Sequence, residues 1–232
     1  MSRLAVRRRK LRAFTLLEVM VAIAIVGLVG VLIYGAFNGM NKSRNNMQKV
    51  NDRYQQGRQA LDRMSRELSG AYISLHQPID QRNYARLTQF VGKSQNPADR
   101  LDFNAFAHRR LEADSHVSDQ LELSYFAATD PETGRLDLVR RSDKYLDMEP
   151  DRGGLILVMV EDIVSFDVRY LDPATFEWVE DWDTSQAAGQ LNRMPAQVWL
   201  ELVVNDQRRG ETIKFETKVS IPIQLPLDFA TK

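Results

Sequence analysis

The feature that most constrains this chain is an almost purely apolar run near its N-terminus. From Phe14 to Ile33 the sequence reads FTLLEVMVAIAIVGLVGVLI, in which Glu18 is the one charged residue. A helix of about 20 residues extends about 30 Å, which matches the hydrocarbon core of a bilayer. We therefore expect a membrane-spanning helix.

Charge is distributed unevenly around this run. Six basic residues and no acidic residue precede Phe14, whereas only Lys42 and Arg44 follow the run closely. The positive-inside rule then predicts a cytoplasmic leader, with the rest of the chain across the membrane. The basic leader residues are Arg3, Arg7, Arg8, Arg9, Lys10 and Arg12.

The remainder of the chain is mildly acidic and contains no cysteine. Of the 31 basic residues, 25 remain after the leader against 31 acidic ones, which gives a net charge of −6. This balance argues against a nucleic-acid-binding surface, which needs clustered lysine and arginine. The lack of cysteine excludes disulfides, thiol catalysis and cysteine-ligated zinc.

Glu18 lies about one turn inside the apolar run. An ionised carboxylate in the membrane costs on the order of a few kcal/mol unless it is paired. If the leader were removed before Phe14, the new α-amino group, with a pKa of about 8, would be mostly cationic and able to pair with Glu18. This pairing would make Glu18 an assembly residue.

Two simpler interpretations of the run remain open. One is a secretory signal peptide, although its best small-x-small cleavage site, Tyr34-Gly35-Ala36, has a bulky first residue. The other is a plain membrane anchor in which Glu18 extends toward the near interface.

The chain turns polar after Gly39, but apolar or small residues recur at steps of three and four. This period indicates an amphipathic helix, and the absence of proline before Pro78 allows one helix from about Phe14 to about Tyr72. Gly35 and Gly39 indicate either a helix-packing motif or, as we favour, a flexible point. The recurring residues are Met47, Val50, Tyr54, Gly57, Leu61, Met64, Leu68 and Ala71.

The segment from Ala13 to Ala22, AFTLLEVMVA after a basic leader, resembles the class III signal of type IV pilins and pseudopilins. This resemblance implies cleavage by prepilin peptidase between Ala13 and Phe14, N-methylation of Phe14 and an assembly role for Glu18. The residue before the cut is usually glycine in this family, so Ala13 is a departure that bears on the efficiency of processing.

Beyond Ser74 the pattern changes toward the period of two that is typical of half-buried strands. Turn sequences begin at Asp130, Asp172 and Asn205 and predict hairpins between successive strands. The expected fold is α+β, with the long helix packed on an antiparallel sheet. The expected strands are 101–107, 120–127, 135–141, 155–160, 164–171, 197–205 and 212–223.

The length of the chain and the stretch from Arg193 to Leu202 resemble the minor pseudopilin J family of type II secretion, also called general secretion pathway protein J. The resemblance implies a pilin-like subunit in the bacterial inner membrane with a single pass and a periplasmic domain. It implies prepilin peptidase and other minor pseudopilins, of the I and K types, as partners in a hetero-oligomer at the pseudopilus tip. The predicted segments are a leader (1–13), a transmembrane and assembly helix (14–37), an amphipathic stem helix (38–75) and a β-rich domain (76–232).

No motif in the sequence indicates catalysis or a cofactor. His76, His108 and His116 lack metal-binding spacing, and neither a phosphate-binding glycine loop nor a nucleophile elbow occurs. We therefore expect no enzyme activity, no cofactor and no metal. The acidic, aromatic segment from Glu177 to Asp183 is either a calcium-binding loop or, as we favour, an exposed loop.

Aromatic and apolar residues outside the membrane run are candidates for contact with partners, because such residues dominate interface hot spots. Two other functions remain open: a minor pilin of a type IV pilus or DNA-uptake system, and a membrane-anchored periplasmic enzyme or binding module. The candidate partner-binding residues are Met47, Val50, Tyr54, Trp178 and Trp182.

Overall fold

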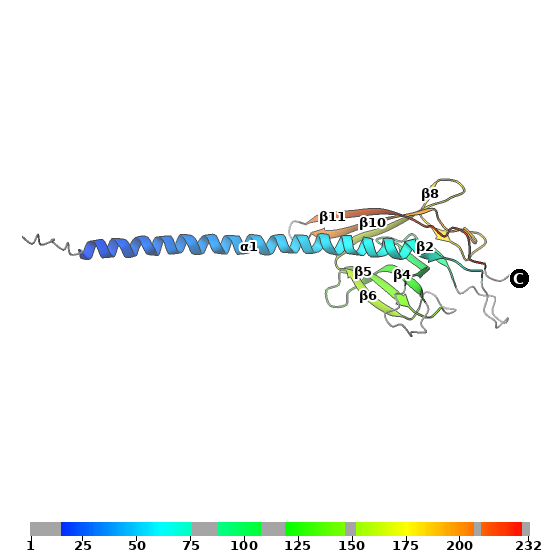
Figure 1. The fold of residues 1–232 in the computed structure, drawn as a ribbon, viewed down its shortest axis with the longest axis horizontal. Helices are drawn as coiled ribbons and strands as arrows, with labels where there is room; N and C mark the ends of the chain where they lie inside the picture. The colour runs from blue at the N-terminus through cyan, green and yellow to red at the C-terminus, as the bar shows by residue number, and fades with distance from the viewer. Residues whose placement is uncertain (1–14, 76–87, 108–118, 147–151, 207–209, 229–232) are drawn as a thin grey trace, which may run out of the picture. The chain divides into compact units, whose positions relative to one another are not determined.

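The computed structural model describes residues 15–75, 88–107, 119–146, 152–206 and 210–228. The chain divides into two compact units, Met1–Asn51 and Asp52–Lys232. Helix α1 (Leu16–Ser69) begins in the first unit and ends in the second, and all strands belong to the second (Figure 1).

The predicted long helix is confirmed, but it ends three residues earlier than expected. Gly70 follows α1, and strand β1 (Ala71–Tyr72) then pairs with β3 (Arg100–Phe106). The carbonyl oxygen of Gly70 accepts a hydrogen bond from the N–H of Phe106 at 3.0 Å. A Cβ atom at Gly70 would lie 3.0 Å from the carbonyl oxygen of Phe106, so the close approach of the two backbones favours glycine and ends the helix there.

The second unit contains two antiparallel sheets. The seven-stranded sheet has the order β6-β5-β4-β3-β2-β9, with β1 added beside β3, and the four-stranded sheet has the order β11-β10-β7-β8. In the first sheet the remaining strands are β2 (Phe90–Lys93), β4 (Gln120–Thr129), β5 (Leu136–Asp143), β6 (Leu155–Val160) and β9 (Trp182–Asp183). In the second they are β7 (Ile163–Leu171), β8 (Trp178–Val179), β10 (Gln197–Asp206) and β11 (Glu211–Ser220).

All seven predicted strands are present, with ends that differ from the expected ones by at most three residues. The predicted hairpins are confirmed by antiparallel pairing of β4 with β5, β7 with β8 and β10 with β11. Strands β1, β2, β8 and β9 were not predicted, because two to four residues are too few to show an alternating pattern. The α+β fold class is confirmed.

The core of the second unit joins the end of α1 to both sheets. In the view of Figure 1 the cyan part of the helix lies between β5–β6 and β10–β11. Its buried apolar residues are Ala60, Leu61, Met64 and Leu68. The ring of Phe90 in β2 lies 5.9 Å from that of Tyr170 in β7, so aromatic side chains link the two sheets.

Candidate assembly site

The first turn of α1 is closed by a reciprocal pair of hydrogen bonds. The N–H of Thr15 donates to Glu18 Oε2 at 3.1 Å, and the N–H of Glu18 donates to Thr15 Oγ1 at 3.3 Å. This capping box satisfies backbone donors that a helix start leaves free, and the Glu18 carboxylate also complements the helix dipole. The box was not predicted, although the Thr-x-x-Glu spacing that produces it is visible in the sequence.

The predicted cleavage site cannot be placed, since Ala13 and Phe14 lie outside the described residues. The pairing of Glu18 with a new amino group therefore stays a prediction. What the structure adds is that Glu18 already accepts two hydrogen bonds from Thr15, one from its N–H and one from its hydroxyl.

The first unit presents an apolar helix surface without cover from its own chain. Every large apolar side chain of α1 from Leu16 to Met47 is exposed. By length and composition, α1 contains a stretch able to cross a membrane. An exposed apolar surface of this extent needs lipid or protein around it in water.

The end of α1 is tied to the first sheet by a buried charged cluster around Glu67. Arg140 Nε donates to Glu67 Oε2 at 3.0 Å, and Arg140 Nη2 lies 2.9 Å from Oε1. The Tyr125 hydroxyl donates to Oε2, and Arg63 Nε donates to Oε1 at 3.2 Å. Glu67, Arg140 and Tyr125 are all buried, so each needs the others to remain satisfied.

Burial and the adjacent Glu67 carboxylate raise the pKa of Tyr125 well above its ordinary value of 10.0. Tyr125 therefore stays protonated at neutral pH and serves as a hydrogen-bond donor. The cluster fixes the last turn of α1 against β4 and β5.

A second polar junction forms around Asp162, in the turn between β6 and β7. Its carboxylate lies 3.6 Å from Arg53 Nη2 and 3.4 Å from Arg135 Nη1, and it accepts a hydrogen bond from Asn205 Nδ2 at 2.8 Å. The φ of Asp162 is 53°, a conformation that aspartate adopts more readily than most residues. One carboxylate thus connects α1, the β4–β5 turn and β10.

The candidate partner-binding residues fall into different surroundings. Met47 is exposed and Val50 is half-buried, while Tyr54 is exposed with its ring edge-on to Phe215 at 5.8 Å. Trp178 is partly exposed, and the centroid of its ring lies 5.2 Å from the Lys218 Nζ atom. These four residues remain available to a partner.

Trp182 is a correction to the expected set. Its side chain is fully buried, and its indole N–H donates to the carbonyl oxygen of Arg193 at 3.0 Å. Its flat apolar body fills the core beside Tyr170, whose ring lies 6.2 Å away. Trp182 is therefore a core residue and not a surface contact.

The acidic segment around Trp178 and Trp182 uses carboxylates within the fold. Asp181 accepts a hydrogen bond from the Ser94 N–H at 2.8 Å, and Asp183 accepts one from the Ser185 N–H at 2.8 Å. Among residues 15–75, 88–107, 119–146, 152–206 and 210–228, no three histidine, aspartate or glutamate side chains are arranged to hold a metal. The three histidines lie outside these ranges.

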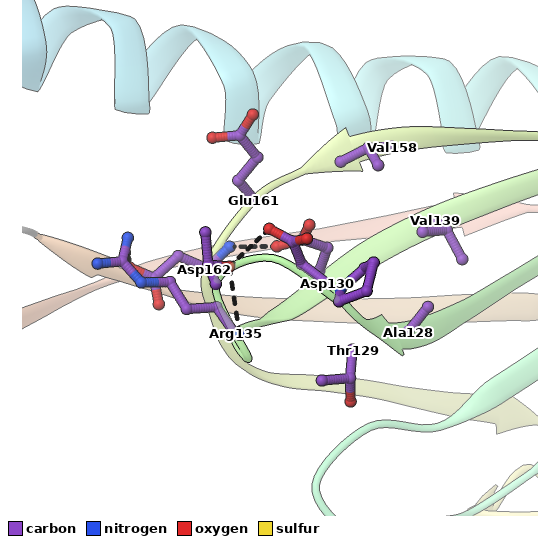
Figure 2. Close-up of a pocket in the computed structure, with 11 residues that line it drawn as sticks. Ala128, Thr129, Asp130, Arg135, Val139, Val158, Glu161 and Asp162 are labelled. Atoms are coloured by element: carbon purple, nitrogen blue, oxygen red, sulfur yellow. Dashed lines mark hydrogen bonds and ion pairs between the residues drawn. The ribbon is translucent and has the colours of Figure 1, made fainter.

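An open pocket of about 370 Å³ lies beside the β4–β5 turn. Figure 2 shows Asp130, Arg135 and Asp162 gathered at one end, with Val139 and Val158 further along the strands. Asp137 and Glu161 also line it. A hydrogen bond from the Thr133 hydroxyl is the main cause that lowers the pKa of Asp130 below its ordinary value, so the rim keeps this negative charge at neutral pH.

Two models of protein families match the sequence of this chain. The family model described as "Type II secretion system (T2SS), protein J" matches residues 35–213. This chain belongs to the protein J family of type II secretion. The model described as "Prokaryotic N-terminal methylation motif" matches residues 8–34, which include Ala13, Phe14 and Glu18. The resemblance to pseudopilin J stated from the sequence is confirmed.

Solved structures include similar pilin-like chains at low sequence identity. One is in "The Crystal Structure of the GspK-GspI-GspJ complex from enterotoxigenic Escherichia coli Type 2 Secretion System", at 14% identity and a TM-score of 0.48, covering 75% of this chain and 97% of that chain. Another is "Type IV-like pilin TTHA1219 from Thermus thermophilus", at 12% identity and a TM-score of 0.45, covering 73% and 96%. No curated protein matches this chain.

Proposed function

We propose that this chain is a minor pseudopilin of the pseudopilus tip, a structural and non-enzymatic subunit that supports protein export across the outer membrane. The observation that carries the proposal is the match of the protein J family over residues 35–213. The partners we propose are minor pseudopilins of the I and K types, in keeping with a solved complex named GspK-GspI-GspJ.

The proposed maturation begins at the N-terminus. Prepilin peptidase cleaves between Ala13 and Phe14, and Phe14 becomes the N-methylated first residue. The methylation motif over residues 8–34 and the apolar start of α1 support this step. Before and after cleavage the chain is a single-pass protein of the bacterial inner membrane, with its strand-rich unit in the periplasm.

Glu18 is the proposed assembly residue. Its carboxylate accepts hydrogen bonds from Thr15 and stands among exposed apolar side chains, which we expect to contact lipid. Cleavage places a cationic amine four residues before it, and pairing with that amine offsets the cost of a charge in the membrane. Where the amine and Glu18 belong to different subunits, the pair also aligns the first turns of their two helices.

The direct test replaces Glu18 with leucine in the host and measures secretion of an exported protein. Because leucine suits the membrane better than glutamate, Glu18→Leu should insert normally while secretion falls at least tenfold. Leu17→Ile, an exposed apolar change one residue away, is the matched control and should secrete normally. Normal secretion by Glu18→Leu would remove the assembly role.

A further inference from the structure

In the described part of the chain, β6, β8, β9 and β11 form the ends of the two sheets, and they are protected in different ways. Strands β8 and β9 have two residues each, which is too short to invite pairing. Strand β11 is long but carries exposed charged side chains, which discourage pairing with a foreign strand. These charged residues are Glu211, Lys214, Glu216 and Lys218.

Strand β6 has neither form of protection. It reads LILVMV, six residues without a charge, and forms the other end of the seven-stranded sheet. Leu155, Ile156, Leu157 and Val158 are exposed by 61%, 54%, 41% and 56%. Exposed apolar side chains on an edge strand are typical of a surface that another protein covers.

Both faces of β6 are apolar. Leu157 is opposite Arg140, on the face where Arg140 meets Glu67 of α1, whereas Ile156 is opposite Arg141 on the other face. In the described part of the chain β5 is the strand that pairs with β6, so half of the β6 backbone groups point outward. An added strand would bury side chains on both faces and bond to this backbone.

The pocket beside β6 indicates which charge an added strand should carry. Val158 is paired with Val139, and both line the pocket, so the pocket reaches the edge strand β6. Its carboxylates are those of Asp130, Asp137, Glu161 and Asp162. In the described part of the chain Arg135 and Arg53 both pair with Asp162, so four negative charges meet two positive ones and a lysine or arginine from outside is favoured there.

We propose that β6 accepts an extended strand from another pilin-like subunit, apolar at successive positions and ending in a lysine or arginine that enters the acidic pocket. The inference rests on the proposed function, because it assigns an assembly surface to the subunit. The mode is β-strand addition, in which backbone hydrogen bonds supply affinity and side-chain pockets supply specificity.

A second copy of β6 fits this edge less well. The register of β6 on β5 shifts between Leu138 and Val139, so Met159 is an extra residue that interrupts the ladder. An antiparallel pair of β6 strands centred on Leu157 would place Met159 of one copy against Leu155 of the other. The interruption would then fall at both ends of a short ladder.

The test uses the full chain in its host, with a photo-crosslinking residue at Ile156 or Val158. Val164 in β7 is the control position, because it is an exposed valine in a strand of the other sheet. We expect at least fivefold more crosslinking to another subunit from β6 than from Val164. In the co-purified assembly, amides of β6 should exchange with deuterium at least tenfold more slowly than in the free chain, and those of β11 should not change.

A paired substitution separates this inference from the proposed function. The double variant Ile156→Lys, Val158→Lys should fold, because both side chains are exposed, and should reduce secretion at least fivefold; Val164→Lys should not. If deletion of the chain stops secretion but the double variant secretes normally, strand addition is wrong and the pseudopilin role stands. If deletion leaves secretion unchanged, the proposed function itself is wrong. Crosslinks from β6 mainly to a second copy or to an exported protein would overturn the inference.

Discussion

Glu18 and Glu67 belong to the first and last turns of the same helix, and they are satisfied in different ways. Glu18 is exposed and bonds to Thr15, three residues away. Glu67 is buried and bonds to Arg140 and Tyr125, which are 73 and 58 residues away along the chain. A carboxylate held by its own turn can take a new partner after processing, whereas one held by distant buried groups fixes the fold.

The largest expected effect follows from removing the charge of Glu67. Glu67→Gln leaves Arg140 buried without its counter-charge, and breaking such a pair should destabilise the second unit by about 3 kcal/mol. Chemical unfolding of the purified full chain in detergent measures this loss. Glu132→Gln, an exposed change in the β4–β5 turn, should stay within about 0.5 kcal/mol of the parent.

A triple variant sharpens the contrast. Glu67→Leu with Arg140→Met and Tyr125→Phe replaces the buried cluster by apolar groups of similar size and removes the hydroxyl that Glu67 accepts from, so it should recover most of the stability that Glu67→Gln loses. If Glu67→Gln were as stable as the parent, the cluster would not be what fixes the end of α1.

The next effect compares two glycines of α1. A Cβ atom at Gly57 would lie 2.4 Å from the Phe215 ring, whereas nothing lies within 4 Å of one at Gly39. Gly57→Ala should therefore destabilise the second unit by about 2 kcal/mol through overpacking. Gly39→Ala should leave that unit within about 0.5 kcal/mol of the parent.

Phe215→Leu provides the internal check on Gly57. The smaller side chain relieves the overlap, so Gly57→Ala should cost less in the Phe215→Leu chain than in the parent, as expected for residues in contact. Equal costs in the two chains would show that Phe215 does not crowd Gly57.

The smallest expected effect concerns Asp99, a buried carboxylate that is held by backbone N–H groups. Asp99 accepts hydrogen bonds from the N–H groups of Gln95 and Val168, but burial is the larger influence and raises its pKa above 3.8. The folded state then favours the protonated acid, so the contribution of Asp99 to stability is present at low pH and is lost as pH rises through the raised pKa. The stability of the parent relative to Asp99→Asn should fall as pH rises through the raised pKa of Asp99. NMR titration of the Asp99 carboxyl should give a midpoint above 3.8.

Much of the fold could be predicted because its signals are local. The apolar run, the period of the stem and the alternation in 197–205 each show in a short window of sequence. Glu18 also could be singled out, since its charge contrasts with every neighbour. Strand β6 was predicted with its observed ends because its apolar run is bounded by Gly154 and by the acidic turn at Glu161.

The remaining features depend on contacts between residues that are far apart in the sequence, which no short stretch of sequence reveals. Glu67 looks like any charged residue of a stem helix, and only the fold brings Arg140 to it. Trp182 and Trp178 are four residues apart and equally aromatic, yet one is core and the other partly exposed, because β9 joins the first sheet and β8 the second. The exposed edge of β6 follows from strand order, which short-range alternation does not reveal.

The intact mass of the chain isolated from the membranes of secreting cells tests the proposed maturation and the role of Glu18 together. We expect the mass of residues 14–232 with one added methyl group on Phe14, the form in which Glu18 gains a cationic amine. A chain that still carries residues 1–13, or one that begins at Phe37, would contradict this expectation.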